Sequence, residues 1–163
     1  MPFSRAQALN ALRTWNPAPV FLDAYATKHL PENLDIYFGP PEEFFLAPDT
    51  QARYTKNRLI PLLDDGNFGL VIFHDPDRRI LIELDVEAPD EVRHSYQNWQ
   101  QYLAGLMLRI GESIDDDHRV SRMADLVGFK HAADLLELWR LIADLPHAEY
   151  ERSCAAFVAG LPA

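Results

Sequence analysis

Cysteine and long apolar runs are what this sequence has least of. Cys154 is the one cysteine among 163 residues, and a lone thiol can form neither an internal disulfide nor a cysteine-rich zinc site. The longest apolar run, 103–108, is interrupted by Gly105 and falls far short of the roughly eighteen residues that a membrane span requires. The first residues also lack the charged and then apolar segment of a secretory signal. We therefore expect a cytoplasmic protein without membrane association.

Basic residues are also scarce. Fifteen Lys and Arg stand against 25 Asp and Glu, which gives a formal charge of −10 and a pI of about 4.9. A basic face for nucleic acid is therefore not expected. The acidic excess lies mostly in residues 61–117, where thirteen acids accompany four bases. Two interpretations stay open: a solvated acidic surface that keeps the protein soluble, and a docking face for a basic partner.

The chain has no internal repeat, low-complexity tract or Gly/Ser linker that would mark a domain boundary. Its length corresponds to about one domain, and its 48% of apolar residues suffices for a packed core. These features predict a single domain over residues 1–163. Its character changes near residue 112, from mixed structure to helix only.

Helix signals dominate the first fifty residues. Ser4 is a candidate N-cap, and Pro17 or Pro19 fits the first turn of a second helix. Prolines then recur so closely that only short helical turns fit between them. The expected segments are a helix that ends at 16–17, a helix that ends at 30–31, and turns over 32–38 and 42–46.

An alternation of apolar and polar residues after residue 58 is typical of β-strands. Residues 64–67 and 75–78 have the composition of tight turns. Because these connections are short, consecutive strands must pair antiparallel. We predict three central strands in meander order, over about 59–63, 68–74 and 79–86, the last of them half buried.

The apolar period lengthens to that of helices after Pro89. Ser95 is the candidate cap of one helix and Ser113 of the next, which Gly128 ends. The first of these helices presents Tyr96, Trp99, Leu103, Leu106, Met107 and Ile110 on one face. A third presents Phe129, Ala132, Ala133, Leu136, Trp139, Leu141 and Ile142, and a fourth begins at Pro146 and turns Tyr150, Cys154, Phe157 and Val158 inward. Leu138 and Trp139 could complete the core or form a dimer seam. The fold class predicted is α+β, an antiparallel-rich mixed sheet packed by helices, with a helical C-terminal extension.

Acidic side chains cluster on and between the predicted strands, where they could converge at one edge of the sheet. Converging carboxylates suit a hard cation, but the calcium-loop pattern is absent, and the Glu-x-Lys of metal-dependent nucleases is replaced by Glu83-Leu84-Asp85. Residues 115–118, three aspartates and a histidine, are better explained by the helix dipole. We therefore predict neither a bound metal nor a cofactor.

No set of residues indicates nucleophilic catalysis. Cys154 falls on the apolar face of a predicted helix, where an inert buried thiol is expected. The six histidines are scattered without paired ligand spacing. Residues 64–69 superficially resemble a phosphate-binding loop, but their acids would repel phosphate, and a hairpin turn explains them better. The sequence therefore predicts a protein that is not an enzyme.

Four stretches follow one another in a characteristic order. They are Leu30-Pro31-Glu32, the run from Ile60 to Gly69 that reads Ile-Pro-Leu-Leu-Asp-Asp-Gly-Asn-Phe-Gly, the strand end Asp85-Val86-Glu87, and the run from Asn98 to Ala104 that reads Asn-Trp-Gln-Gln-Tyr-Leu-Ala. Together they resemble the SMI1/KNR4 family of the SUKH superfamily. The likeness covers about residues 28–112 and leaves a helical extension over about 113–163.

The resemblance implies an α+β domain without a catalytic constellation, used to bind other proteins. Bacterial members of the family are often immunity proteins that neutralise toxin domains, many of them nucleases, while fungal members scaffold cell-wall signalling. Our first hypothesis is an immunity-type protein whose acidic face blocks a basic toxin domain. A housekeeping scaffold or regulator is the second hypothesis, and a metal-dependent enzyme that uses the acidic cluster is the third. The oligomeric state stays open, a dimer included. The candidate partner-binding residues are Asp64, Asp65, Asp75, Glu83, Asp85 and Glu87.

Overall fold

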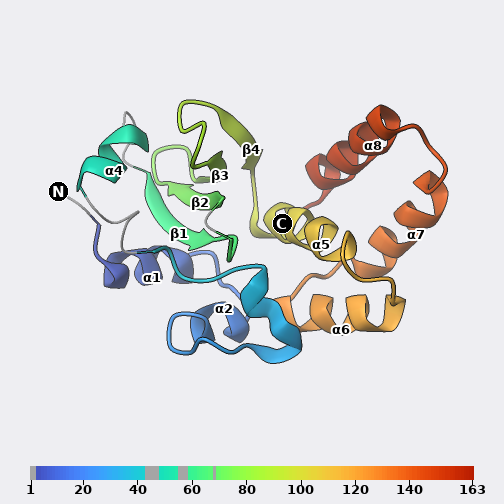
Figure 1. Ribbon diagram of the computed structural model, residues 1–163, viewed down its shortest axis with the longest axis horizontal. Coiled ribbons are helices and arrows are strands. Elements are labelled where there is room, and N and C mark those ends of the chain that lie inside the picture. Colours follow the sequence, from blue (N-terminus) through green and yellow to red (C-terminus); the bar gives the residue numbers. More distant parts are fainter. Residues whose placement is uncertain (1–2, 43–47, 55–58, 68) are drawn as a thin grey trace. The chain divides into compact units, whose positions relative to one another are not determined.

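The structure, a computed structural model, describes residues 3–42, 48–54, 59–67 and 69–163 (Figure 1). The chain divides into two compact units, Met1–Gln97 and Asn98–Ala163. The first holds an antiparallel sheet with helices and the second holds helices only, which confirms the predicted α+β class. The change in character falls at residue 97 rather than near residue 112. No described helix is long and apolar enough to cross a membrane.

The first two helices begin at residues that favour a helix start, a serine cap and a proline. Ser4 caps α1 (Arg5–Arg13) as predicted, because its hydroxyl accepts the Gln7 N–H and the Gln7 side chain accepts the Ser4 N–H in return. Pro19 opens α2 (Pro19–Asp23), at a position where the missing N–H of proline removes no helix bond. This second helix is shorter than predicted and ends well before residues 30–31.

Two short helices lie in the proline-rich segment. The 3-10 helix η1 (Pro31–Ile36) matches the turn predicted over 32–38. The helix α4 (Pro48–Tyr54) lies where only a loop is expected from the sequence. The turn predicted over 42–46 falls almost entirely outside the described residues.

One sheet of four strands forms the centre of the first unit, in the order β1-β2-β3-β4. All neighbouring pairs are antiparallel, so the meander of three predicted strands is confirmed and no parallel pair is present among the described strands. Phe68, predicted as the start of the second strand, lies outside the described residues. The strands are β1 (Ile60–Asp64), β2 (Leu70–Asp75), β3 (Ile80–Asp85) and β4 (Val92–Tyr96).

The fourth strand corrects the sequence prediction for the residues after Pro89. The helix predicted to include Tyr96, with Ser95 as its cap, begins only at Trp99, and both earlier residues lie in β4. Tyr96 is buried as an apolar helix residue would be, but it is buried opposite Leu81 of β3. Its spacing from Trp99 therefore fits a helix face by coincidence.

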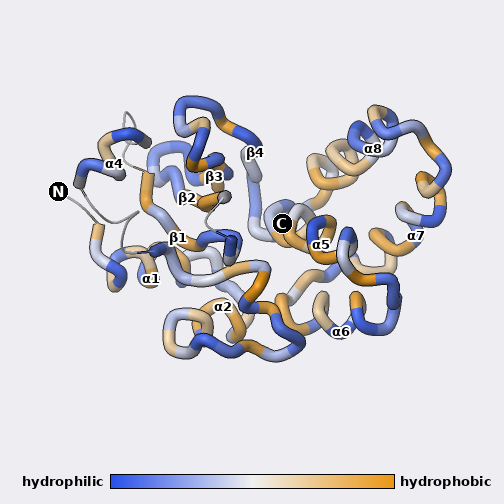
Figure 2. The backbone as a smooth tube through the Cα atoms, viewed as in Figure 1, coloured by the Kyte–Doolittle hydropathy of each residue, from blue (hydrophilic) through white to orange (hydrophobic). Residues whose placement is uncertain are grey.

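The central strands are buried on both faces. One face carries an apolar cluster made of Leu59, Val71, Phe73, Ile80, Ile82 and Leu84. Leu81, on the other face of β3, is fully buried, and Glu83 on that face is 5% exposed, so β3 is not the half-buried strand that its alternation predicts. Burying such side chains stabilises the sheet by about 1.5–3 kcal/mol each. Figure 2 shows hydrophobic residues along these strands and hydrophilic ones in their connections.

Side chains from the N-terminal helices and loops attach to the first half of the sheet. Helix α1 packs against β1. The Trp15 ring meets the edge of His74 with ring centroids 5.5 Å apart. The Tyr25 hydroxyl donates a hydrogen bond to the Leu62 carbonyl, and burial raises the pKa of this tyrosine, so it stays a neutral donor.

Four helices build the second unit: α5 (Trp99–Gly111), α6 (Asp117–Val127), α7 (Ala132–Ile142) and α8 (His147–Gly160). Asn98 caps α5 by accepting the Gln101 N–H. Asp116 caps α6 by accepting the N–H groups of His118 and Arg119. These caps replace the serines that the sequence suggested, because aspartate and asparagine bind the first-turn N–H groups equally well and stand closer to the actual starts.

Two boundaries of these helices lie where the sequence predicts them, the end of α6 and the start of α8. Gly128 ends α6 with a left-handed φ of 75°, as predicted. Pro146 stands immediately before α8. Ser113, the predicted cap of α6, instead donates from its hydroxyl to the Ile110 carbonyl at the end of α5.

Two buried glutamines of α5 hold the second unit together. Gln100 donates to the Gly128 carbonyl and accepts the Lys130 N–H, both at 3.0 Å. Gln101 donates to two carbonyls at the end of α8, those of residues 159 and 161, at 3.1 and 3.2 Å. Each glutamine is 6% exposed, so these bonds satisfy groups that have little access to water.

Helix α7 turns only part of the predicted face inward. Ile142 is buried as predicted and so is Leu135, which lies outside the predicted face, whereas Ala133 is exposed and Leu141 is 71% exposed. Trp139 lies against Gly111 of α5, so closely that a Cβ at this glycine would stand 2.3 Å from the indole ring. Trp139 therefore completes the core of this unit, one of the two roles considered for it.

Candidate protein-binding surface

The acids predicted to contact a partner are distributed over both ends of the sheet. Asp64 ends β1 and Asp65 follows it, while Asp85 ends β3 and Glu87 lies in the connection beyond. The register joins these two groups at one end, since Leu70 pairs with Asp85 and the Val86 N–H donates to the Gly69 carbonyl at 3.0 Å. Asp75 closes β2 at the opposite end, and Glu83 lies inside β3. The structure thus brings four of the six acids to one end.

Asp64 and Asp65 shape the turn between β1 and β2. Asp64 is 4% exposed, and its Oδ1 accepts the Gly66 N–H at 2.9 Å. Asp65 is half-buried, and its Oδ1 accepts the N–H groups of Asn67 and Gly69, each at 3.1 Å. These bonds satisfy backbone donors that the hairpin ladder leaves open, which is what aspartate commonly does at turns.

Asp64 is unusual in its titration. Burial raises its pKa to about 6, because removal from water penalises the charged form. The Gly66 N–H and the Arg5 charge act in the opposite direction, while Glu42 and Asp65 add to the rise. This carboxyl group is therefore a poor candidate for a direct ionic contact with a partner.

Asp75 plays the same structural part at the other end of the sheet. It is 2% exposed, and its Oδ1 accepts the N–H groups of Asp77 and Arg78 at 3.0 and 3.1 Å. Its Oδ2 accepts the Arg78 Nε–H at 2.7 Å. Burial works to raise the pKa of Asp75, but these bonds outweigh it and hold that pKa below the ordinary value. Asp75 is ionised and already fully engaged inside its own turn.

Glu83 and Asp85 share a cation that the sequence analysis did not identify. Arg93 Nε lies 3.7 Å from Glu83 Oε1, and Arg93 Nη1 lies 3.8 Å from Asp85 Oδ2. The Tyr96 hydroxyl donates to Glu83 Oε2 at 3.1 Å, and Asp85 Oδ1 accepts the Glu87 N–H at 2.9 Å. Arg93 was missed because it belongs to β4. The sequence offers only the turn composition of residues 88–91 as a signal for this strand, because Val92 and Tyr96 alone among its residues favour strands.

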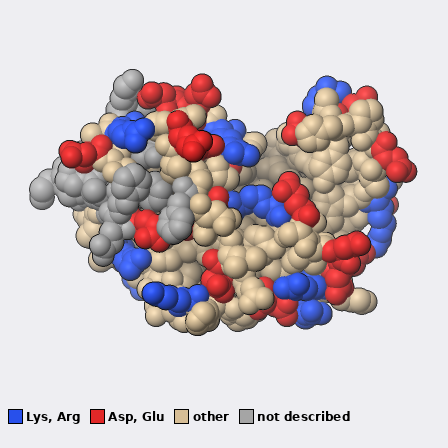
Figure 3. All heavy atoms as spheres, viewed as in Figure 1, with Lys and Arg blue, Asp and Glu red and all other residues tan. Residues whose placement is uncertain are grey.

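The exposed carboxylates at this end come mainly from the connection between β3 and β4. Glu87, Asp90 and Glu91 are exposed, and Asp65 and Asp85 are half-exposed. We call these five residues the acidic end of the sheet. Figure 3 shows acidic side chains gathered over the β3–β4 connection, at the top of the view. The one Lys or Arg in residues 85–93 is Arg93, which Glu83 and Asp85 partly neutralise.

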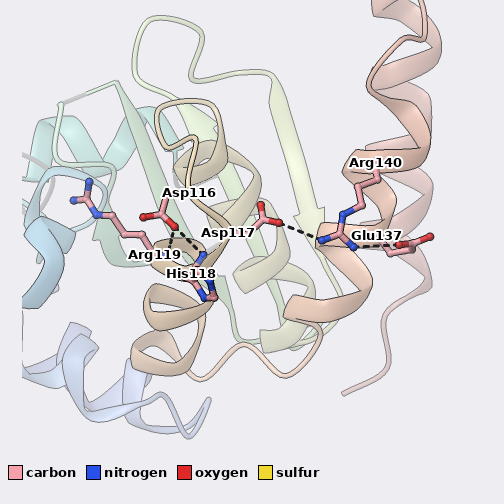
Figure 4. A network of polar contacts seen from close by, with 6 residues as sticks. All are labelled: Asp116, Asp117, His118, Arg119, Glu137 and Arg140. Atoms are coloured by element: carbon pink, nitrogen blue, oxygen red, sulfur yellow. Dashed lines mark hydrogen bonds and ion pairs between the residues drawn. The ribbon is translucent and has the colours of Figure 1, made fainter.

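The other acidic cluster considered, residues 115–118, has separate tasks on the helices (Figure 4). Asp116 caps α6, and its hydrogen bonds with the first-turn N–H groups lower its pKa. Asp117 pairs with Arg140 of α7 at 3.2 Å, and Arg140 also lies 3.5 Å from Glu137. Within the described part of the chain, no three His, Cys, Asp or Glu side chains are grouped to hold a metal ion.

Cys154 lies on the inner face of α8 and is 8% exposed. Burial raises the pKa of its thiol, and a thiol with a raised pKa carries little of the reactive thiolate at neutral pH. The geometry around it thus matches the inert buried thiol expected from the sequence.

Comparisons of the chain with models of protein families, with curated proteins and with solved structures found no match.

Proposed function

We propose that this chain is a non-enzymatic protein-binding domain of the immunity type, whose acidic end meets the basic surface of a toxin domain. The proposal rests above all on one observation: three exposed carboxylates, Glu87, Asp90 and Glu91, lie together on one short connection. A cluster of one sign of charge attracts an oppositely charged surface over a distance of about one Debye length and speeds its association.

The contact set is narrower than the six acids first considered. Asp64, Asp75 and Glu83 are buried, so they support the surface rather than touch a partner. Asp65 and Asp85 accept backbone hydrogen bonds through one oxygen and are half-exposed, and the second oxygen of Asp85 lies 3.8 Å from Arg93 Nη1. The proposal therefore assigns direct contacts to the acidic end, which shares Asp65, Asp85 and Glu87 with the original set. Membership of the SMI1/KNR4 family stays a prediction beside it.

The test is co-purification of tagged protein from its native cells at low and moderate salt, with captured proteins identified by mass spectrometry. We expect a stoichiometric basic protein that is lost as salt rises, and that is toxic when expressed alone but harmless when this chain is co-expressed. A persistent partner without toxicity would replace the immunity hypothesis by the scaffold hypothesis.

A charge-reversed variant locates the contact surface. Glu87→Lys, Asp90→Lys and Glu91→Lys change exposed side chains outside the turn hydrogen bonds, so the fold should persist. We expect the association rate with the captured protein to fall roughly tenfold or more and its salt dependence to weaken. The matched control carries Asp23→Lys, Asp115→Lys and Asp125→Lys, three exposed acids that do not belong to the acidic end. Equal losses in both variants would show an effect of net charge alone.

A further inference from the structure

A stripe of leucines on the helical unit is not used in its core. Leu141 of α7 is 71% exposed, Leu145 in the turn after α7 is 38% exposed, and Leu138 is half-buried. These residues are three and four positions apart, which places them on one side of a helix and its continuation. We call them the leucine stripe. Exposed single leucines are common on protein surfaces, but three in helical register form a patch.

The packing of α7 explains why the leucine stripe faces outward. Leu135 and Ile142 are buried on the inner side of the helix. The indole ring of Trp139 fills the space over Gly111, which fixes the rotation of α7 about its own axis. With these three residues turned inward, the stripe must lie on the flank of the helix. The Leu145 N–H donates to the Ile142 carbonyl at 3.1 Å, so the turn holds Leu145 close to the end of α7.

Acidic residues lie beside the leucine stripe. Asp134 and Glu137 are exposed on α7, four positions before Leu138 and Leu141, which places them next to the stripe on the helix surface. Asp144 directly precedes Leu145. Arg140 pairs with Asp117 at 3.2 Å and with Glu137 at 3.5 Å (Figure 4), and His131 lies 3.4 Å from Asp134. Four carboxylates thus accompany one arginine here, so the charge beside the stripe is negative.

We propose that the leucine stripe docks a basic amphipathic helix of another protein, with its apolar side on the leucines and its Lys or Arg residues on the acids beside them. Such a helix complements the patch in both hydropathy and charge, the two features by which helices are bound in grooves and on faces. A second copy of this chain would bring the same acids against one another, which like-charge repulsion opposes. The surface is independent of the acidic end proposed above, because it lies in the other unit.

The probe is a labelled helical peptide of leucine and lysine with an apolar face, titrated with full-length protein and followed by fluorescence anisotropy. We expect saturable binding that weakens as sodium chloride rises. A peptide of the same composition in scrambled order, which has the charge but no apolar face, should bind at least tenfold more weakly. A leucine and glutamate peptide should not bind.

The variant Leu141→Glu with Leu145→Glu tests the leucines themselves. Both side chains are exposed, so the unit should fold, and a thermal melt by circular dichroism checks this. We expect at least tenfold weaker peptide binding even though the variant is more acidic. The matched control Ala133→Glu adds charge at an exposed site on another side of α7 and should bind as tightly as wild type. Leu141→Gln with Leu145→Gln repeats the test without added charge.

Four results would overturn the proposal. The first is equal affinity for the amphipathic and scrambled peptides, which would mean that charge alone attracts them. The second is unchanged affinity of the leucine variants, and the third is no binding of the amphipathic peptide. A concentration-dependent dimer of wild type that the leucine variants abolish would also overturn it, because a second copy would then be the occupant.

Discussion

Aspartates at strand ends serve the fold of the sheet before they serve any partner. Asp64, Asp65, Asp75 and Asp85 each accept at least one backbone N–H from the turn that follows them. Such donors would otherwise face either water or a desolvated gap. The same residue type therefore explains why the middle of the chain is acidic and why much of that charge is unavailable for contacts.

The turn after β2 depends most strongly on one carboxylate. We expect Asp75→Ala to lower the free energy of unfolding by roughly 2–4 kcal/mol, because a buried ionic acceptor is lost and three donors lose their partner. Urea denaturation at pH 7 measures the change. Asp77→Ala in the same turn removes an exposed carboxyl group and is the control, with an expected change within about 0.5 kcal/mol. Similar losses in the two variants would contradict the assignment.

The pKa of Asp75 also sets a pH window. Because it is lowered in the folded state, the ionised carboxylate stabilises the fold above its unfolded pKa of 3.8, and this contribution disappears as the pH falls through the folded value. The difference between wild type and Asp75→Ala should therefore shrink below pH 4. A difference that stays constant down to pH 2 would show that its origin is not the charge.

Asp64 should behave in the opposite way. Its pKa is about 6 in the folded protein, against an ordinary value of 3.8 for an aspartate in water. Between these two pH values the folded state binds more protons than the unfolded state, so ionisation of Asp64 destabilises the fold as the pH rises. We expect Asp64→Asn, which keeps an oxygen for the Gly66 N–H, to stabilise the protein at pH 7 by up to about 3 kcal/mol. The gain should vanish near pH 4.

The measurement is urea denaturation of both proteins at several pH values between 4 and 7. Burial lowers the pKa of His74, so protonation of this histidine destabilises the fold as the pH falls. Comparing the variant with wild type at each pH cancels this contribution, because both proteins contain His74. A gain independent of pH would contradict the raised pKa of Asp64.

At the scale of elements, the sequence predicts what short-range chemistry determines. The three central strands follow from alternation and turn composition, and the end of α6 follows from Gly128. The fourth strand could not be found in this way, because four of its five residues are exposed and an edge strand needs no apolar alternation. Its place is set by pairing with β3, which is a tertiary contact.

The two buried glutamines of α5 bind different segments of the second unit, so replacing each one should affect a different segment. We expect Gln101→Leu to destabilise the protein by roughly 1–3 kcal/mol, since the Ala159 carbonyl loses its side-chain donor and the Leu161 carbonyl keeps only that of Asn98. Amide hydrogen exchange should then increase at the end of α8. Gln100→Leu is the matched variant, and it should increase exchange around residues 128–130 instead. Faster exchange in the same segment for both variants would contradict these separate roles.

For the molecule as a whole, the candidate site shows where reasoning from sequence stops. The acids themselves and their position near strand ends could be predicted from composition and turn signals. Which of them are buried could not, because alternation along β3 marks Glu83 as solvent-facing while the structure covers both faces of that strand. Arg93 could not be paired with Glu83 and Asp85 without knowing the register of β4. Burial and ion pairing arise from packing between distant segments.

The net charge of −10 leads to a prediction about the whole chain. Unpaired carboxylates repel one another in the compact state, and salt screens this repulsion at separations beyond about 10 Å at 0.1 M. Neutralising four exposed acids, by Asp77→Asn, Glu87→Gln, Asp90→Asn and Glu91→Gln, removes charge without touching a turn hydrogen bond made by a side chain. At low salt this variant should be at least as stable as wild type, and its stability should depend less on salt.

Urea denaturation at low and at moderate sodium chloride measures this effect. The control is the variant Asp23→Asn with Asp125→Asn, which neutralises two exposed acids outside the acidic end. If the four acids instead formed favourable contacts within the chain, the neutralised variant would be less stable at low salt. That result would mean that Asp77 of the β2–β3 turn or the carboxylates of the β3–β4 connection are held by the protein itself. The result we expect leaves the three carboxylates of the β3–β4 connection as a repulsive cluster that a basic partner would relieve, so self-repulsion within the free protein would become part of the driving force for binding.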